Sequence, residues 1–214
     1  QMCIRDSYPT VESDGSFTIN IPLYHHTQVR MMIGNADLVI LLSPEKETNV
    51  AINLSNPPGK QFVFSGQYAT INNEWCQPEL ITKIPPVYSD GDLLDSIVGI
   101  SANEFKKRCI NQYKRYVTHN SAQLQFSEDT RTLANLSCAF DCLENLQATH
   151  YCLQTAYQKK ENITREQAFA AFLDVYLPDD FHNYLKDFPV NHPLALYCYN
   201  YRNVVMDLYD THKD

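Results

Sequence analysis

The hydrophobic period of this chain changes once, near Gly66, from two residues to about 3.6. Before Gly66, apolar and polar residues alternate in short runs; after it, apolar residues recur three or four positions apart. Alternation is typical of strands with one buried face, and the longer period is typical of helices. We therefore expect an α+β fold, with an antiparallel β domain at residues 8–66 and an all-helical domain at residues 67–214.

Five short strands are predicted before Gly66, at residues 17–21, 29–33, 38–42, 50–54 and 61–65. The turn pair Asp14-Gly15 precedes the first, and Gly34-Asn35 separates the second from the third. Connections this short leave no room for crossover helices. The strands should therefore form a largely antiparallel sheet.

Two capping boxes mark helix starts after Gly66: serine to glutamate at residues 101–104, and threonine to glutamine at 164–167. The longest helical segment is expected at residues 127–159. The last helix should begin near 191–193, with Asn191 as its cap and Pro193 in its first turn. An apolar stripe follows the longest segment: Leu133, Leu136, Phe140, Leu143, His150 and Tyr157. That segment should bury one side along most of its length.

The formal net charge of -8 argues against nucleic acid or an anionic membrane surface as the main partner, because both need clustered positive potential. Basic residues do gather on the helix predicted after residue 101: Lys106, Lys107, Arg108, Lys114 and Arg115. Such a spread is more often a solvated face than a binding patch. The longest aliphatic run, residues 38–42, is far shorter than the roughly 20 apolar residues that cross a bilayer.

Cysteine is the residue type most open to a chemical role. Beyond residue 7 the chain has Cys76, Cys109, Cys138, Cys142, Cys152 and Cys198. Their even number allows disulfides. A chain with a sizeable core does not need disulfide cross-links for its stability, so buried free thiols are the favoured interpretation. The Cys138 and Cys142 pair could supply two metal ligands from one side of a helix. Cys152 would lie about 15 Å further along a continuous helix, so structural thiols are again the better interpretation.

Other candidate residues do not combine into a site; they are His25, His26, Lys60, His150, Asp179 and Asp180. The two adjacent histidines should point to opposite faces, and the third lies on the apolar stripe. The lysine follows Pro57-Pro58-Gly59 but lacks the rest of a phosphate loop, and the macrodipole explains carboxylates at a helix start. We predict no catalytic, cofactor-binding or metal-binding residue.

Residues 1–7 look like an artefact. Gln1-Met2-Cys3-Ile4-Arg5-Asp6-Ser7 can be back-translated into the transposon end that is used to make sequencing libraries. We therefore expect that native sequence begins near Tyr8, in the middle of a gene, that the start of the protein is missing, and that residues 1–7 pack against nothing. The absence of a signal peptide or lipid-anchor cysteine then says nothing about location.

Three segments carry a resemblance: residues 11–19 with D-G-x-F, residues 41–50 with an L-x-P turn, and residues 64–74 with F-x-G followed by a helix that opens with N-x-E. In this order they resemble the non-catalytic N-terminal part of TlpA-like thiol-disulfide oxidoreductases from Bacteroidetes. In those envelope proteins a β domain and a helical stretch precede a thioredoxin-fold domain. The similarity extends to residues 131–142 and 187–201.

The family's chemistry resides in a W-C-x-x-C site, whereas Trp75-Cys76 has no second cysteine at that spacing. The resemblance therefore implies an accessory module of a periplasmic or lipid-anchored redox protein. Such a module would position a downstream thioredoxin-like domain or bind its client. The alternative is a stand-alone envelope module for a glycan or peptide. The 14 tyrosines permit a sugar platform but are equally expected of a packed core. A third interpretation, a small enzyme in its own right, is supported by no group of residues in the sequence.

Overall fold

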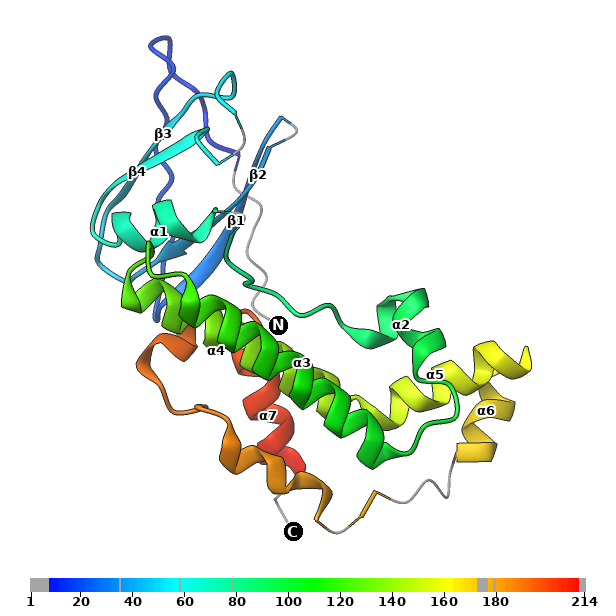
Figure 1. The fold of residues 1–214 in the computed structure, drawn as a ribbon. Helices are drawn as coiled ribbons and strands as arrows, with labels where there is room; N and C mark the ends of the chain where they lie inside the picture. Colours follow the sequence, from blue (N-terminus) through cyan, green and yellow to red (C-terminus); the bar gives the residue numbers. More distant parts are fainter. Residues whose placement is uncertain are drawn as a thin grey trace.

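The computed structural model describes residues 8–34, 36–57, 59–77, 79–172, 177–178 and 180–211. The fold is α+β, as predicted: the strands of the described residues all precede the helices (Figure 1). The strands are β1 (Thr27–Ile33), β2 (Ala36–Leu42), β3 (Thr48–Ile52) and β4 (Phe62–Gly66). The α-helices are α1 (Ala69–Trp75), α2 (Gly91–Ser96), α3 (Ala102–Ala122), α4 (Glu128–Gln147), α5 (Thr149–Glu161), α6 (Arg165–Phe172) and α7 (Tyr201–Thr211). The 3₁₀ turns are η1 (Val87–Ser89), η2 (Phe181–Asp187) and η3 (Pro193–Tyr197).

The strands pair antiparallel, as predicted, but they form two separate two-stranded sheets instead of one. In the first hairpin, Thr27 pairs with Leu42; in the second, Thr48 pairs with Gly66. Leu38, Ile40 and Phe64 form a small hydrophobic cluster that holds the two hairpins together.

The strand predicted at residues 17–21 is not formed. The turn before it is confirmed, because the Gly15 amide donates to the Glu12 carbonyl and the Ser16 amide donates to the Asp14 carboxylate, each at 2.9 Å. Phe17 and Ile19 are half-buried beside exposed neighbours, so the alternation is real. A strand also needs a paired neighbour, and alternation alone does not supply one.

Both capping boxes lie at helix starts. The Ser101 hydroxyl accepts from the Glu104 amide at 3.2 Å at the start of α3. In the second box, before α6, the bonds are reciprocal: Thr164 and Gln167 each accept from the other's amide, at 3.3 and 2.9 Å.

The long helix predicted at residues 127–159 is wrong as a single element, because it divides at Ala148 into α4 and α5. Beside this division, the buried Thr149 hydroxyl donates to the Leu146 carbonyl at 2.6 Å. The last predicted helix is also divided, into η3 and α7. Its start is capped by His192, not by Asn191: the ring Nδ1 of His192 accepts from the Leu194 amide at 3.2 Å.

The main core lies around α4, which contacts α1, α3, α5, α7 and η3. Leu133, Ala134, Cys138 and Leu143 are fully buried on it. An irregular segment, residues 79–86, leads from α1 to α2, and its Ile81 backbone is held at both polar groups by the Asn120 side chain, at 2.9 and 2.8 Å. The helix α1 contacts both β4 and α4, and so joins the strands to the core.

Candidate functional site

The six cysteines beyond residue 7 are free, and Cys109, Cys138, Cys142, Cys152 and Cys198 are buried. The prediction of buried free thiols is therefore confirmed for these five, whereas Cys76 is free but only partly buried. Burial raises the pKa of Cys109, Cys138 and Cys152 to about 12 and raises that of Cys142 and Cys198 as well. Since thiolate is the reactive form, these groups are poorly suited to disulfide exchange.

Helix α4 does carry Cys138 and Cys142 together, but the Cys138 thiol donates to the Ile81 carbonyl at 3.1 Å. The break at Ala148 removes the premise that placed Cys152 at a fixed distance along one helix. Within the described residues, no group of three or more His, Cys, Asp or Glu side chains is arranged to hold a metal ion.

The two adjacent histidines do differ in orientation: His25 is exposed and His26 is partly buried. The Nδ1 atom of His26 lies 2.6 Å from the Ser43 hydroxyl and 3.0 Å from the Tyr197 hydroxyl. A serine beside an imidazole is the start of a nucleophile–base pair. Here Ser43 is 5% exposed, so a substrate would not reach it. The contacts instead connect the residue before β1 with the residue after β2 and with η3.

The N-x-E residues of the resemblance connect the strands to the helices. They lie three residues inside α1, which begins at Ala69, and not at its opening as expected. The Asn72 amide group bonds the Leu41 backbone, at 2.8 and 3.1 Å, and that of Asn73 bonds the Phe64 backbone at the same two distances.

Glu74 completes this connection at the start of α4. Its Oε2 atom accepts from the Ser127 amide at 3.0 Å, the Ser127 hydroxyl at 2.6 Å and the Thr130 hydroxyl at 2.5 Å. Burial raises the pKa of Glu74, but these hydrogen bonds outweigh burial and the net pKa is lowered. The carboxylate therefore stays ionised at a helix N-terminus, where negative charge is favoured.

The sequence analysis did not single out two carboxylates on α4, Asp141 and Glu144. Their spacing of three residues beside a predicted apolar stripe could have indicated that they lie close together at the core. The Asn200 amide donates to both, at 2.8 and 2.6 Å. The second Asp141 oxygen accepts from the Ile84 amide at 2.7 Å. Burial raises the pKa of Asp141 to about 6. Both of its oxygens are engaged in holding other segments, so the pair is structural.

The remaining candidates stay apart. Lys60 sits in a turn in which its amide donates to the Pro57 carbonyl at 3.0 Å. Asp180 is the exposed residue before η2, and His150 is partly buried on α5. Three residues named in the predictions, and the leader at 1–7, lie outside the described residues: Asn35, Pro58 and Asp179.

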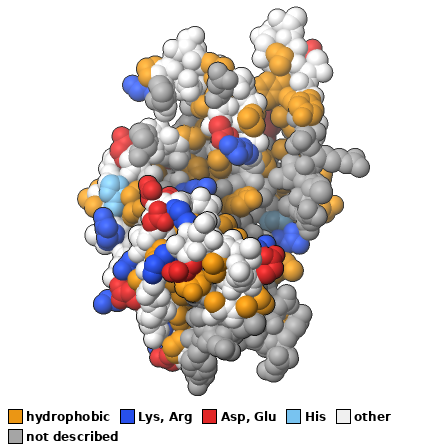
Figure 2. Space-filling view, turned by 90° about the vertical axis from the view of Figure 1, so that its right-hand side faces the viewer, with side chains coloured by type: hydrophobic (Ala, Val, Ile, Leu, Met, Phe, Trp, Pro, Cys, Tyr) orange, Lys and Arg blue, Asp and Glu red, His pale blue; other side chains and the backbone are white. Residues whose placement is uncertain are grey.

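The charged side chains form no single-sign field on the face shown in Figure 2, where acidic and basic groups are interspersed. On α3, Lys106 reaches across to the Phe181 carbonyl at 3.2 Å, and Arg108 bonds the Ser96 carbonyl at 2.7 Å. Two of the five basic residues thus hold neighbouring segments. None of the helices in the described ranges combines the length and apolar character that a membrane span requires.

Comparisons with family models, with curated proteins and with solved structures find no match for this chain.

Proposed function

We propose that this chain is a non-catalytic accessory module of an envelope thiol-disulfide oxidoreductase, where it positions a downstream thioredoxin-like domain or binds that domain's client. The observation that carries the proposal is the role of the N-x-E residues. Asn72, Asn73 and Glu74 hold β2, β4 and the start of α4 in fixed relation. These three residues of the resemblance therefore fix the strands relative to the helices, which is a structural role of the kind that an accessory module requires.

The thiols support the same proposal. A disulfide reductase needs an accessible thiolate and a second cysteine nearby to resolve the mixed disulfide. Cys76 is the least buried of the six, has its pKa raised by burial, and has no second cysteine at C-x-x-C spacing. Redox chemistry would then belong to another domain of the parent protein, in the periplasm or at a lipid-anchored position.

A stand-alone envelope module that binds a glycan or peptide is the second candidate. It is favoured by tyrosines that do not enter the core: Tyr8, Tyr24 and Tyr199 are each more than 80% exposed. Exposed aromatic rings are suited to stacking on a ligand.

The gene downstream of Asp214 distinguishes the two candidates. A W-C-x-x-C motif within the following few hundred codons is expected if the chain is an accessory module. A stop codon directly after Asp214 would contradict that proposal and leave the stand-alone module. The result does not depend on folding or on a chosen ligand.

A further inference from the structure

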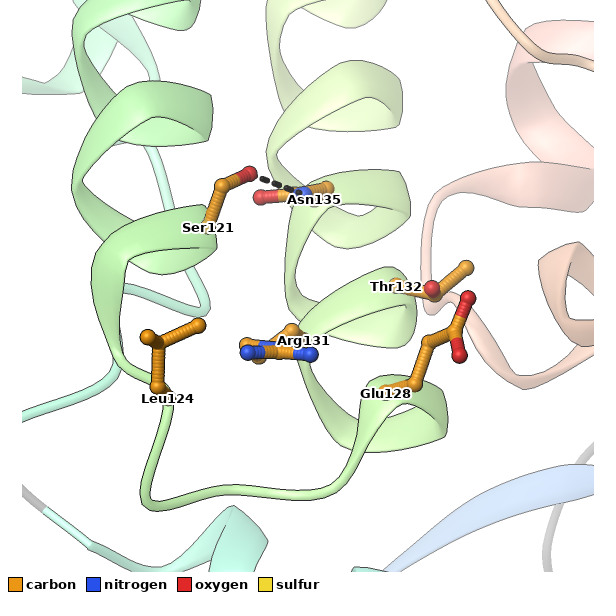
Figure 3. Close-up of a pocket in the computed structure, with 6 residues that line it drawn as sticks. All are labelled: Ser121, Leu124, Glu128, Arg131, Thr132 and Asn135. Carbon is orange, nitrogen blue, oxygen red and sulfur yellow. Dashed lines mark hydrogen bonds between the residues drawn. The ribbon is translucent and has the colours of Figure 1, made fainter.

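The surface hollow between the end of α3 and the start of α4 favours no class of ligand. Glu128 and Arg131 line it with opposite charges, and the Asn135 amide nitrogen donates to the Ser121 hydroxyl at 3.4 Å (Figure 3). The edges of the strands are more selective, because the unpaired backbone groups of a strand edge recognise another main chain.

Helix α1 covers the edges of two strands. A primary amide carries the donor and the acceptor of a peptide group. The Asn72 side chain uses both on the backbone of Leu41 in β2, and the Asn73 side chain uses both on the backbone of Phe64 in β4. Each amide thus stands where the next strand of a sheet would pair.

The register of the hairpin of β3 and β4 shows which way the β3 backbone points. Phe64 directs its amide and carbonyl to α1, away from β3, so Phe64 and its partner Val50 form a pair without mutual hydrogen bonds. Asn53, three residues further on, donates to the Gln61 carbonyl at 2.8 Å, which fits this alternation. Val50 and Ile52 therefore direct their amides and carbonyls outward, and no hydrogen bond within the described part of the chain reaches them there.

Among the described strands, β3 has the least cover along its free edge. The one element with which it makes extensive contact is β4, which lies between β3 and α1 in Figure 1. Charged residues or proline usually protect an edge strand, and Thr48–Ile52 contain neither. In contrast, β1 contacts η3 and carries Arg30, which pairs with Asp37. The β3 edge is therefore the one most open to a further strand.

We propose that the β3 edge binds an extended peptide segment of another protein, which pairs antiparallel with Val50 and Ile52 as a third strand. The unpaired amides and carbonyls supply the main-chain hydrogen bonds of such strand addition. Alternate side chains of the peptide lie on the same face as Val50, which packs against the small hydrophobic cluster of the two hairpins. Apolar residues therefore suit every second position of the peptide.

Charge selects this occupant over a second copy of the chain. Glu45 and Glu47 are exposed just before β3, and in antiparallel pairing they lie beside the C-terminal end of the peptide, where lysine or arginine suits them. Two copies of this chain, each with a formal net charge of -8, would instead repel each other. An accessory module would use the edge for a client and a stand-alone module for a peptide ligand, so the site does not depend on which of the two proposed functions holds.

The test is an NMR titration of the ¹⁵N-labelled chain with the blocked peptide Thr-Val-Thr-Val-Thr-Val-Lys-Thr-Lys. Saturable shifts confined to β3 and β4 are expected, with a Kd of about 0.1–1 mM for so short a contact. Hydrogen exchange gives the direct evidence. The amides of Val50 and Ile52 should exchange at least about tenfold more slowly in the complex, whereas the amide of Ala51, which already faces β4, should change little.

Modified peptides locate the contact without altering the fold of the chain. N-methylation of the valines removes the donors that face β3 and should abolish binding, whereas N-methylation of the threonines between them removes donors from the other edge and should change the Kd by less than about threefold. Glutamates in place of the lysines should weaken binding by about fivefold or more.

Three results would overturn the proposal. The first is no slowing of exchange at Val50 and Ile52 when the peptide is in excess. The second is equal binding of the two methylated peptides. The third is a dimer in sedimentation velocity that protects the same two amides without peptide, which would assign the edge to a second copy of the chain.

Discussion

Asparagine amides fix much of this molecule at the level of single residues. Each of four side chains bonds backbone groups of a distant segment; they are Asn72, Asn73, Asn120 and Asn145. The partner of Asn145 is the segment that contains Pro85 and Val87, 58 to 60 positions away. Because such partners are set by the tertiary fold, the sequence could show these residues but could not show what they bind.

Replacing Glu74 tests the connection between the strands and α4. Glu74→Ala removes one acceptor from three donors and should lower the free energy of unfolding by about 2 kcal/mol in urea denaturation. The effect should be present at neutral pH. The difference in stability between the parent chain and Glu74→Ala should shrink as pH falls through the lowered pKa of Glu74, because a protonated carboxyl is neutral, as the alanine side chain is.

The matched control is Glu79→Ala, at an exposed position just beyond α1. It should change stability by less than about 0.5 kcal/mol. Equal losses from the two changes would contradict the role assigned to Glu74.

Asp141 should give the opposite pH dependence. Its pKa is raised by burial to about 6, so its contribution to stability is present at low pH and is lost as pH rises through that value. Between pH 7.5 and pH 5, the parent chain should gain about 1 kcal/mol relative to Asp141→Asn. Unfolding measured at both pH values checks this. The control is Asp92→Asn, at an exposed position, which should show the same increase in stability between pH 7.5 and pH 5 as the parent chain. A parent chain that loses stability relative to Asp141→Asn over this range would refute the role assigned to Asp141.

At the scale of elements, the sequence predicts those that local pattern defines and fails where tertiary contacts decide. Short alternating or apolar runs locate the four strands β1 to β4, and a capping serine locates the start of α3. The same alternation at residues 17–21 yields no strand. No glycine or proline stands at the division of α4 from α5 at Ala148, so no local sequence signal marks it.

The segment at residues 79–86 depends on a contact with Asn120, on α3. Asn120→Ala leaves the Ile81 amide and carbonyl without these bonds in a partly buried site and should cost about 2–3 kcal/mol. Hydrogen exchange at the Ile81 amide should accelerate at the same time. Asn111→Ala, at an exposed position on the same helix, should leave that exchange rate unchanged; comparable acceleration in both variants would contradict the assignment.

At the scale of the whole molecule, strands and helices form one connected structure. α1 contacts both β4 and α4, while His26 and Tyr197 join the residues before β1 to η3. The sequence predicts this α+β order from the change of period at Gly66. It also predicts the absence of a candidate redox pair, which stays a prediction until activity is measured. What it could not predict is that Asn72, Asn73 and Glu74, the N-x-E residues of the resemblance, lie where the strands meet the helices.

The most direct test of the non-catalytic account is an insulin-reduction assay on the purified chain. A pKa of about 12 leaves roughly one thiol in 10⁵ ionised at pH 7, so Cys138 and Cys152 should not attack a disulfide. We predict a rate no higher than that of the reductant alone. Turnover above that rate, abolished by Cys138→Ser or Cys142→Ser in a chain that still folds, would contradict the account and place a redox site in the helical core.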